Sequence, residues 1–171
     1  MTFSFGNEFP ANVKVLVIDH DIDLLNAIDK TLSQFNYQVT TCSTVSSASN
    51  LIAQKVHFDL VLLETQMPDM DSFDFLQQLT QQVNIPVIMT MCSEGSTNYG
   101  IIKAIENGAC DCFVKPFAEN QVKYMWHHAV RKMMKGNKKH KINEQLGVEG
   151  SQIRARDDSN LPLKDATSEK G

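Results

Sequence analysis

The sequence predicts an α/β domain in which five parallel strands form one doubly wound sheet with helices on both faces. Three observations support this fold class. Short apolar segments rich in β-branched residues alternate with amphipathic segments of helical spacing. The alternation repeats five times with short connections, which is typical of parallel sheets joined by right-handed crossovers. The apolar segments are also nearly continuous, as in strands that are buried on both faces.

The first two strand and helix pairs are clear in the sequence. VKVLVID at 13–19 predicts the first strand, and apolar residues at helical spacing predict a helix over 22–35 with Asp21 as its N-cap. YQVTTC at 37–42 predicts the second strand. A Ser/Thr-rich start at 43–47 then leads into the second helix.

The remaining elements follow the same pattern. They are the strand FDLVLLE at 58–64, a helix over roughly 71–82, the strand IPVIMTM at 85–91, a helix over roughly 96–107 that ends at Gly108, the strand CDCFVK at 110–115, and a final helix from about Ala118 to Met134. Beyond Lys135 the apolar periodicity stops. We therefore expect an N-terminal extension at 1–12, one domain at 13–135, and a basic then polar tail at 136–171 that stays disordered.

Charge and composition exclude several classes of protein. Residues 1–130 carry 6 Lys and Arg against 14 Asp and Glu, residues 131–141 carry 6 basic and no acidic residues, and residues 142–171 carry 4 against 6. An acidic domain repels the phosphates of nucleic acids, so we expect no direct nucleic-acid binding by this chain. No run approaches the roughly 18 apolar residues of a membrane helix, and the start lacks the features of a signal peptide. We expect a protein of the nucleus or cytosol whose four cysteines are reduced.

Polar residues follow the ends of the predicted strands, where parallel sheets bind their ligands. They are Asp19, His20 and Asp21 after the first strand, Glu64 at the end of the third, Thr90 and Met91 at the end of the fourth, and Lys115 before Pro116 at the end of the fifth. We take these residues as the candidate site.

The combined pattern resembles the receiver domain of response regulators in two-component phosphorelay signalling. The resemblance covers about 13–134 and rests on the segments VLVIDHD, DLVLLETQMPDMDSF, PVIMTM and NGACDCFVKPF. In sequence, these segments most resemble plant response regulators and pseudo-response regulators. It implies the receiver, or flavodoxin-like, fold.

The resemblance also implies a chemistry from which this chain departs. In an active receiver, two acids after the first strand and an acceptor aspartate at the end of the third hold Mg²⁺, and the aspartate takes a phosphoryl group from a phosphohistidine. Asp19 and Lys115 match the first acid and the lysine of this pattern. The acceptor position holds Glu64 and the second acidic position holds His20. We therefore expect no cofactor, weak or absent Mg²⁺ binding and no ordinary phosphorylation.

The switch positions of the family are altered as well. By distance from Pro86, the hydroxyl residue of the fourth strand aligns with Met91, although Thr90 or Ser93 can shift into its place. The aromatic switch position aligns with Cys112.

Several interpretations of these residues remain open. Glu64 is either a mimic of the phosphorylated state, with its carboxylate on Lys115, or part of an inert but folded site. His20 with Asp19, Asp21 and Glu64 also forms a set of possible transition-metal ligands. The basic run at 131–141 is either a nuclear-import signal or a solvated helix end.

The resemblance implies a pseudo-receiver, which is a binding module rather than an enzyme. We expect it to act by protein contact in plant two-component or clock signalling, where one role open to it is the regulation of transcription. We expect it to lie in the nucleus, with the cytoplasm as the alternative. Expected partners are histidine-phosphotransfer proteins, other response regulators or a second copy of the chain. The alternatives are a phosphorylatable receiver that accepts phosphate from a histidine-phosphotransfer protein on Glu64 or Asp69, and a flavodoxin-like redox protein.

The expected contact surface consists of the fourth helix, the fifth strand and the last helix. In the last helix, Val122, Trp126, Val130 and Met133 form one apolar stripe. Tyr124, Met125 and His128 add further large side chains on its flanks, which predicts that some of them meet a partner.

Overall fold

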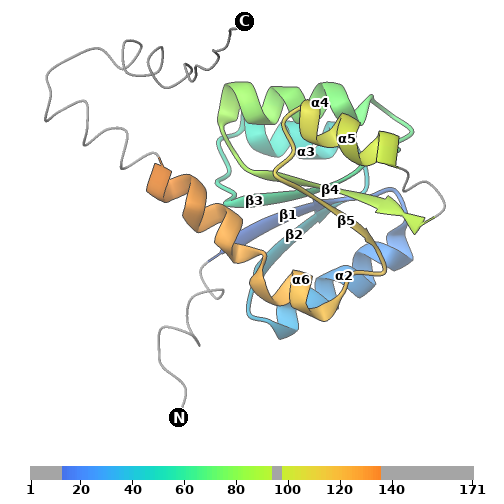
Figure 1. Ribbon diagram of the computed structural model, residues 1–171, viewed down its shortest axis with the longest axis vertical. Helices are drawn as coiled ribbons and strands as arrows, with labels where there is room; N and C mark the ends of the chain where they lie inside the picture. The colour runs from blue at the N-terminus through green and yellow to red at the C-terminus, as the bar shows by residue number, and fades with distance from the viewer. Residues whose placement is uncertain (1–12, 94–97, 136–171) are drawn as a thin grey trace, which may run out of the picture. The chain divides into compact units, whose positions relative to one another are not determined.

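The computed structural model describes residues 13–93 and 98–135 of the chain. Five parallel strands form one sheet in the order β2-β1-β3-β4-β5, which confirms the predicted fold class (Figure 1). The strands are β1 (Lys14–Ile18), β2 (Gln38–Cys42), β3 (Leu60–Glu64), β4 (Val87–Cys92) and β5 (Asp111–Lys115).

Helices cover both faces of this sheet. They are α2 (Ile22–Gln34), α3 (Val45–Ala53), α4 (Ser72–Gln78), α5 (Asn98–Glu106) and α6 (Glu119–Tyr124), with a π-helical turn, η2 (Leu79–Val83), directly after α4. Figure 1 shows α2 and α6 on one face and α3, α4 and α5 on the other. We call the first the α2/α6 face.

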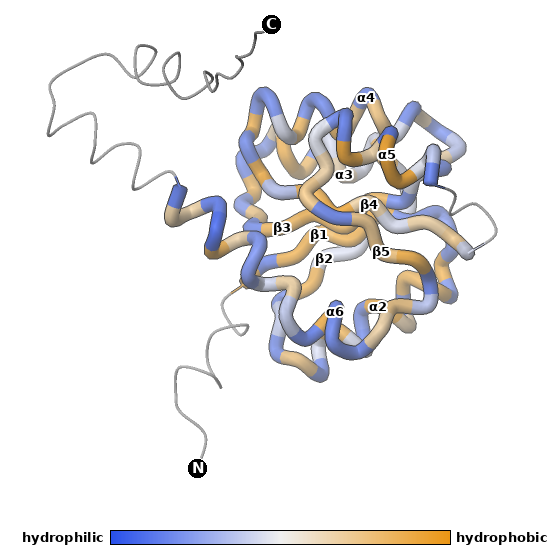
Figure 2. The backbone as a smooth tube through the Cα atoms, in the orientation of Figure 1, coloured by the Kyte–Doolittle hydropathy of each residue, from blue (hydrophilic) through white to orange (hydrophobic). Residues whose placement is uncertain are grey.

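Two apolar clusters form the core, one on each face of the sheet. Because side chains alternate along a strand, β1 contributes Leu16 and Ile18 to one cluster and Val15 and Val17 to the other. All five residues of β3 are buried. Figure 2 shows the result as hydrophobic strands at the centre and hydrophilic stretches along the outer sides of the helices.

The helix predicted over 71–82 is present over 72–83 but changes its form along the way. Regular α-helix ends at Gln78 and continues as η2, which closes where Asn84 has φ 66° and its N–H donates to the carbonyl of Leu79 over 2.7 Å. One physical reason is the hydroxyl of Thr80, which donates to the Leu76 carbonyl over 3.0 Å and competes with the backbone ladder.

The final helix also differs from the prediction. It is not continuous from Ala118 to Met134, because α6 ends at Tyr124, Met125 is a turn, and helix resumes at residue 126. The sequence predicts Met125 on a flank of the apolar stripe of this helix, but the structure places it in the core. Its side chain is 1% exposed and packs in the core cluster of the α2/α6 face.

The chain divides into two units. Met1–Val130 contains the sheet, and in Arg131–Gly171 residues 131–135 are helical. Across the described ranges, we find no helix with the length and apolar character needed to cross a membrane. The predicted extension at 1–12 and tail at 136–171 lie outside the described residues.

Candidate functional site

The site lies at the carboxyl edge of the sheet, where three charged side chains come from three strands. Asp19 directly follows β1, Glu64 ends β3 and Lys115 ends β5. By strand alternation, each projects from the same side of the sheet as the residue two positions before it, and those residues pack on the α2/α6 face. Sequence reasoning therefore named three residues that the fold brings together.

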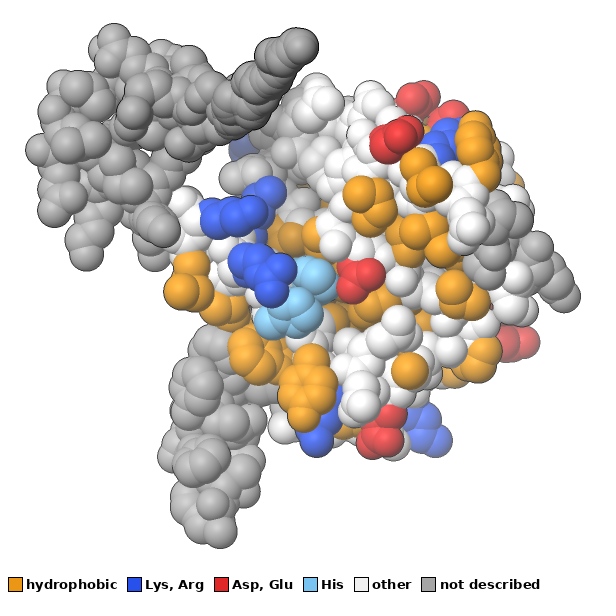
Figure 3. Space-filling view, viewed as in Figure 1, with side chains coloured by type: hydrophobic (Ala, Val, Ile, Leu, Met, Phe, Trp, Pro, Cys, Tyr) orange, Lys and Arg blue, Asp and Glu red, His pale blue; other side chains and the backbone are white. Residues whose placement is uncertain are grey.

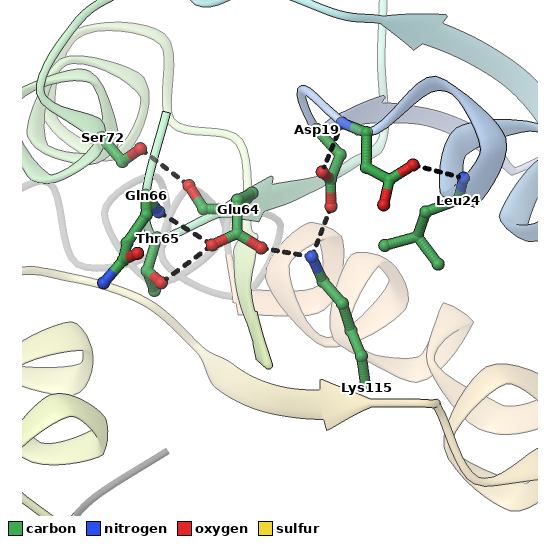
Figure 4. Close-up of polar contacts among 8 residues, drawn as sticks. Asp19, Leu24, Glu64, Thr65, Gln66, Ser72 and Lys115 are labelled. Carbon is green, nitrogen blue, oxygen red and sulfur yellow. Dashed lines mark hydrogen bonds and ion pairs between the residues drawn. The ribbon is translucent and has the colours of Figure 1, made fainter. Parts of the chain in front are cut away.

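The ammonium group of Lys115 stands between the two carboxylates (Figure 4). Its Nζ lies 2.5 Å from Asp19 Oδ2 and also forms an ion pair with Glu64 Oε1. The side chains of Asp19, Glu64 and Lys115 are 2%, 6% and 13% exposed. A cation that belongs to the protein thus offsets one of the two negative charges, in a place where water screens little.

The remaining carboxylate oxygens also have donors. Glu64 Oε2 accepts from the backbone N–H of Gln66 over 2.8 Å and from the hydroxyl of Thr65 over 3.1 Å. Asp19 Oδ1 accepts from the backbone N–H of Asp21 over 3.0 Å. Each of the four carboxylate oxygens of Asp19 and Glu64 accepts at least one hydrogen bond. We call Asp19, Glu64 and Lys115 together the closed group.

These contacts decide the charge state of the lysine. Burial acts to lower the pKa of Lys115, but the hydrogen bonds and negative charges of Asp19 and Glu64 outweigh burial and hold the pKa above its ordinary value. Lys115 is therefore a permanent cation near neutral pH.

The other two residues after β1 are exposed, and their side chains are not part of the ion pairs. His20 is exposed. Asp21 caps α2, as predicted, because its side chain accepts from the N–H of Leu24 over 3.1 Å. Within 13–93 and 98–135, no three or more His, Cys, Asp or Glu side chains are grouped so as to hold a metal ion. Mg²⁺ prefers oxygen ligands, whereas the second acidic position of the family holds the imidazole of His20.

The switch-equivalent residues are mostly enclosed. Thr90 and Met91 in β4 are 3% and 2% exposed, and Thr90 pairs with Glu64 in the strand register. Cys112 is half-buried, with its Sγ 3.9 Å from the carbonyl of Ile101 in α5. Burial, with a smaller effect of the Asp111 carboxylate, raises the pKa of the Cys112 thiol to about 11, so this thiol stays protonated and unreactive.

The sequence does not predict the roles of two polar residues near the site. Ser72 is 2% exposed, and its hydroxyl donates to the backbone carbonyl of Glu64 over 2.7 Å, which ties the start of α4 to the end of β3. Thr65 supplies the hydroxyl on Glu64 described above. Sequence spacing gives no signal for either contact, since both depend on how the loop after β3 closes.

Asp69, considered as a second phosphoacceptor, is engaged elsewhere. Its two carboxylate oxygens accept from the N–H groups of Val45 and Ser46 at the start of α3, over 3.2 and 3.0 Å, and from the Ser46 hydroxyl. Desolvation acts to raise the pKa of Asp69, but the hydrogen bonds together hold it below its ordinary value. Asp69 joins the loop after β3 to α3.

Comparison with known proteins finds relatives for most of this chain. A family profile described as the response regulator receiver domain matches residues 15–126. The chain is 36% identical over 142 residues to the two-component response regulator ORR21 of Oryza sativa subsp. japonica, and 35% identical over 142 residues to the two-component response regulator ARR11 of Arabidopsis thaliana. Each match covers 82% of this chain, but only 20% and 25% of the two relatives. The chain therefore spans a quarter or less of these two relatives.

Solved structures show the same fold. The signal receiver domain of a DNA-binding response regulator from Colwellia psychrerythraea 34H superimposes with a TM-score of 0.62 at 21% identity, covering 70% of this chain and 99% of that one. The chemotaxis response regulator CheY4 of Vibrio cholerae gives a TM-score of 0.58 at 27% identity, covering 68% and 98%. With its sheet order, its carboxylate and lysine edge and these matches, the chain belongs to the response regulator receiver domain family.

Proposed function

We propose that this chain is a pseudo-receiver, a non-enzymatic signalling module that binds other proteins without taking up phosphate. The proposal is carried by one observation, the closed group in which Lys115 bridges Asp19 and Glu64. In this arrangement the carboxylate at the acceptor position already has a cation on one oxygen and two donors on the other.

The residue at the acceptor position argues in the same direction. Glutamate is one methylene longer than aspartate, so the Glu64 carboxylate extends about 1.5 Å farther, into the space that an incoming phosphoryl group needs. Phosphoryl transfer depends mainly on positioning and on charge neutralisation by a metal ion. Both requirements are weakened here, and we expect Mg²⁺ to bind weakly or not at all.

The closed group also suggests a fixed signalling state. Glu64 supplies about one negative charge where a phosphoryl group supplies nearly two, but it holds Lys115 without any modification. We infer that the domain stays in one state and that its partner binding is constitutive.

The binding surface in this proposal is the face formed by α5, β5 and α6 (Figure 3). In α5 the side chains of Tyr99, Ile102 and Ile105 are 74%, 53% and 47% exposed, and Tyr124 at the end of α6 is 50% exposed. Spacing of three residues places the α5 side chains along one ridge. An apolar ridge of this kind is typical of protein contact surfaces.

The candidate partners follow from the family to which the chain belongs. They are histidine-phosphotransfer proteins, other response regulators or a second copy of the chain, in two-component or clock signalling that controls transcription. A nuclear location, with the cytoplasm as the alternative, is part of the same proposal and rests on the basic run at 131–141.

The decisive experiment is phosphorylation of the purified chain. We expect incubation with acetyl phosphate or a phosphorylated histidine-phosphotransfer protein, in the presence of Mg²⁺, to leave the intact mass unchanged. The double variant His20→Asp with Glu64→Asp should gain at least partial acceptance, provided that Met91 does not block the site. A phosphoryl adduct on the wild-type chain that is lost in Glu64→Gln would instead establish a phosphorylatable receiver.

A further inference from the structure

The last helix of the domain is interrupted at Met125, where the backbone keeps helical angles (φ −65°, ψ −17°) but the hydrogen-bond ladder changes, without any residue that usually breaks helices. From Ala118 to Val130 the sequence is AENQVKYMWHHAV, which contains no proline and no glycine. Yet α6 ends at Tyr124, Met125 is a turn, and helix resumes at residue 126. A break of this kind requires another cause, such as a side chain inserted into the backbone ladder.

The hydroxyl of Tyr37 occupies the position of such an insertion. In a continuous helix, the N–H of Trp126 would donate to the carbonyl of Val122, four residues earlier. Here the Tyr37 hydroxyl donates to the Val122 carbonyl over 2.7 Å and accepts from the Trp126 N–H over 3.2 Å. One side-chain hydroxyl therefore bonds both backbone groups that would otherwise meet.

Tyr37 is held firmly enough to act as an insertion. Its side chain belongs to the core cluster that also contains Val122 and Met125, and the residue is 4% exposed. Its backbone N–H donates to the Leu32 carbonyl at the end of α2, over 3.3 Å. The phenol thus reaches the last helix from a fixed point between α2 and β2.

The break has a consequence on the surface. Beyond it, His128 Nε2 lies 3.2 Å from Asp111 Oδ2 in β5, and Ala129 is buried. Between β5 and α6 lies an open hollow of about 260 Å³. Its lining includes Asp111, Tyr124, Met125 and His128.

We propose that Tyr37 is a positioning residue whose hydroxyl breaks the last helix at Met125 and thereby shapes this hollow on the contact face. The importance of the hollow for binding rests on the proposed function. The role of Tyr37 does not, because it concerns the path of the backbone alone.

The test is direct detection of the backbone hydrogen bond by NMR, through scalar coupling between the Trp126 nitrogen and the Val122 carbonyl carbon. We expect no such coupling in the wild-type chain and a measurable one in Tyr37→Phe, since removal of the hydroxyl lets the two groups meet. In the same variant, the contact between the His128 and Asp111 side chains should be lost from the nuclear Overhauser spectrum.

A matched control is Tyr124→Phe, which removes an exposed hydroxyl from the same helix. This variant should show the wild-type pattern in both measurements. The coupling in the wild-type chain, or a folded Tyr37→Phe chain without it, would overturn the proposal. Because a wild-type spectrum alone can refute the proposal, the test remains valid if Tyr37→Phe does not fold. Failure of phosphorylation-independent partner binding would contradict the proposed function and leave these couplings as they are.

Discussion

At the scale of single residues, the enclosed lysine dominates the site. An exposed ion pair contributes roughly 0–1 kcal/mol, but removing one partner of a buried pair leaves an uncompensated charge and costs about 3–5 kcal/mol. Lys115 is the shared ion-pair partner of two carboxylates whose side chains are 2% and 6% exposed. The larger cost, that of breaking a buried ion pair, therefore applies to the loss of Lys115.

We predict that Lys115→Met lowers the free energy of unfolding by about 3 kcal/mol or more. Glu64→Gln added to this variant should recover part of the loss, because it removes one of the unpaired charges. Urea unfolding of the wild type, both single variants and the double variant gives the coupling energy. Strictly additive effects of the two substitutions would show that the pair contributes nothing.

Asp69 gives a pH dependence with a defined sign. Hydrogen bonds to α3 hold its pKa in the folded chain below the value of 3.8 expected without them. A lowered pKa contributes stability that is present above pH 3.8 and is lost as the pH falls through the folded-state value.

Asp69→Asn should therefore destabilise the chain more at pH 6 than near pH 3, as measured by urea unfolding at both values with buffers of equal ionic strength. Asp74→Asn, another exposed acid close by in α4, is a suitable control and should show a smaller difference. Equal effects of Asp69→Asn at the two pH values would dismiss this linkage.

At the scale of elements, the junction of η2, α5 and β5 depends on one glycine. Gly108 has φ 111°, which side chains rarely tolerate. A Cβ built there would also lie 2.9 Å from the Thr80 hydroxyl oxygen, which is engaged with the Leu76 carbonyl. Strain in the backbone and a close contact act together.

Gly108→Ala should accordingly destabilise the chain by more than about 1 kcal/mol, although alanine usually stabilises at positions it can adopt. The thermal midpoint and urea unfolding measure the loss. Combining it with Thr80→Ala separates the two causes, since that change relieves the contact and leaves the φ angle strained. Full recovery in the combined variant would mean that φ contributes no strain.

At the scale of the whole molecule, the sequence predicted the architecture because its signal is distributed over many residues. The buried run in β3 and the Asp21 cap of α2 were both correct. The errors concern contacts between distant parts. The break at Met125 depends on Tyr37, 88 positions earlier in the chain, and no helical period records such a contact.

For the site, too, the sequence predicts some contacts and not others. That Asp19, Glu64 and Lys115 meet could be predicted, because the ends of parallel strands share one edge. The bonds of Thr65, Gln66 and Ser72 to Glu64 depend on the closure of one loop, and the sequence pattern carries no information on it.

Self-association is the prediction that belongs to this scale. Ile102→Lys on the α5 ridge should change the free energy of unfolding by no more than about 0.5 kcal/mol, as expected of an exposed position. It should weaken any self-association or partner binding measured by sedimentation or titration. Val83→Lys, at a residue 41% exposed on η2, is the matched control. Identical binding by wild type and Ile102→Lys would exclude this ridge as the contact surface.

The sequence separation of Asp19, Glu64 and Lys115 has a consequence for folding kinetics. Lys115 lies 96 positions after Asp19 and 51 after Glu64, on the edge strand that completes the sheet. Until β5 docks, Asp19 and Glu64 lack the counter-ion that Lys115 supplies, so this part of their repulsion is relieved only when β5 joins the sheet. Contacts of such long range are expected to form late, after the main folding barrier. Lys115→Met should then accelerate unfolding while the refolding rate stays nearly constant. In the wild-type chain, Lys115 therefore slows the unfolding of the completed domain.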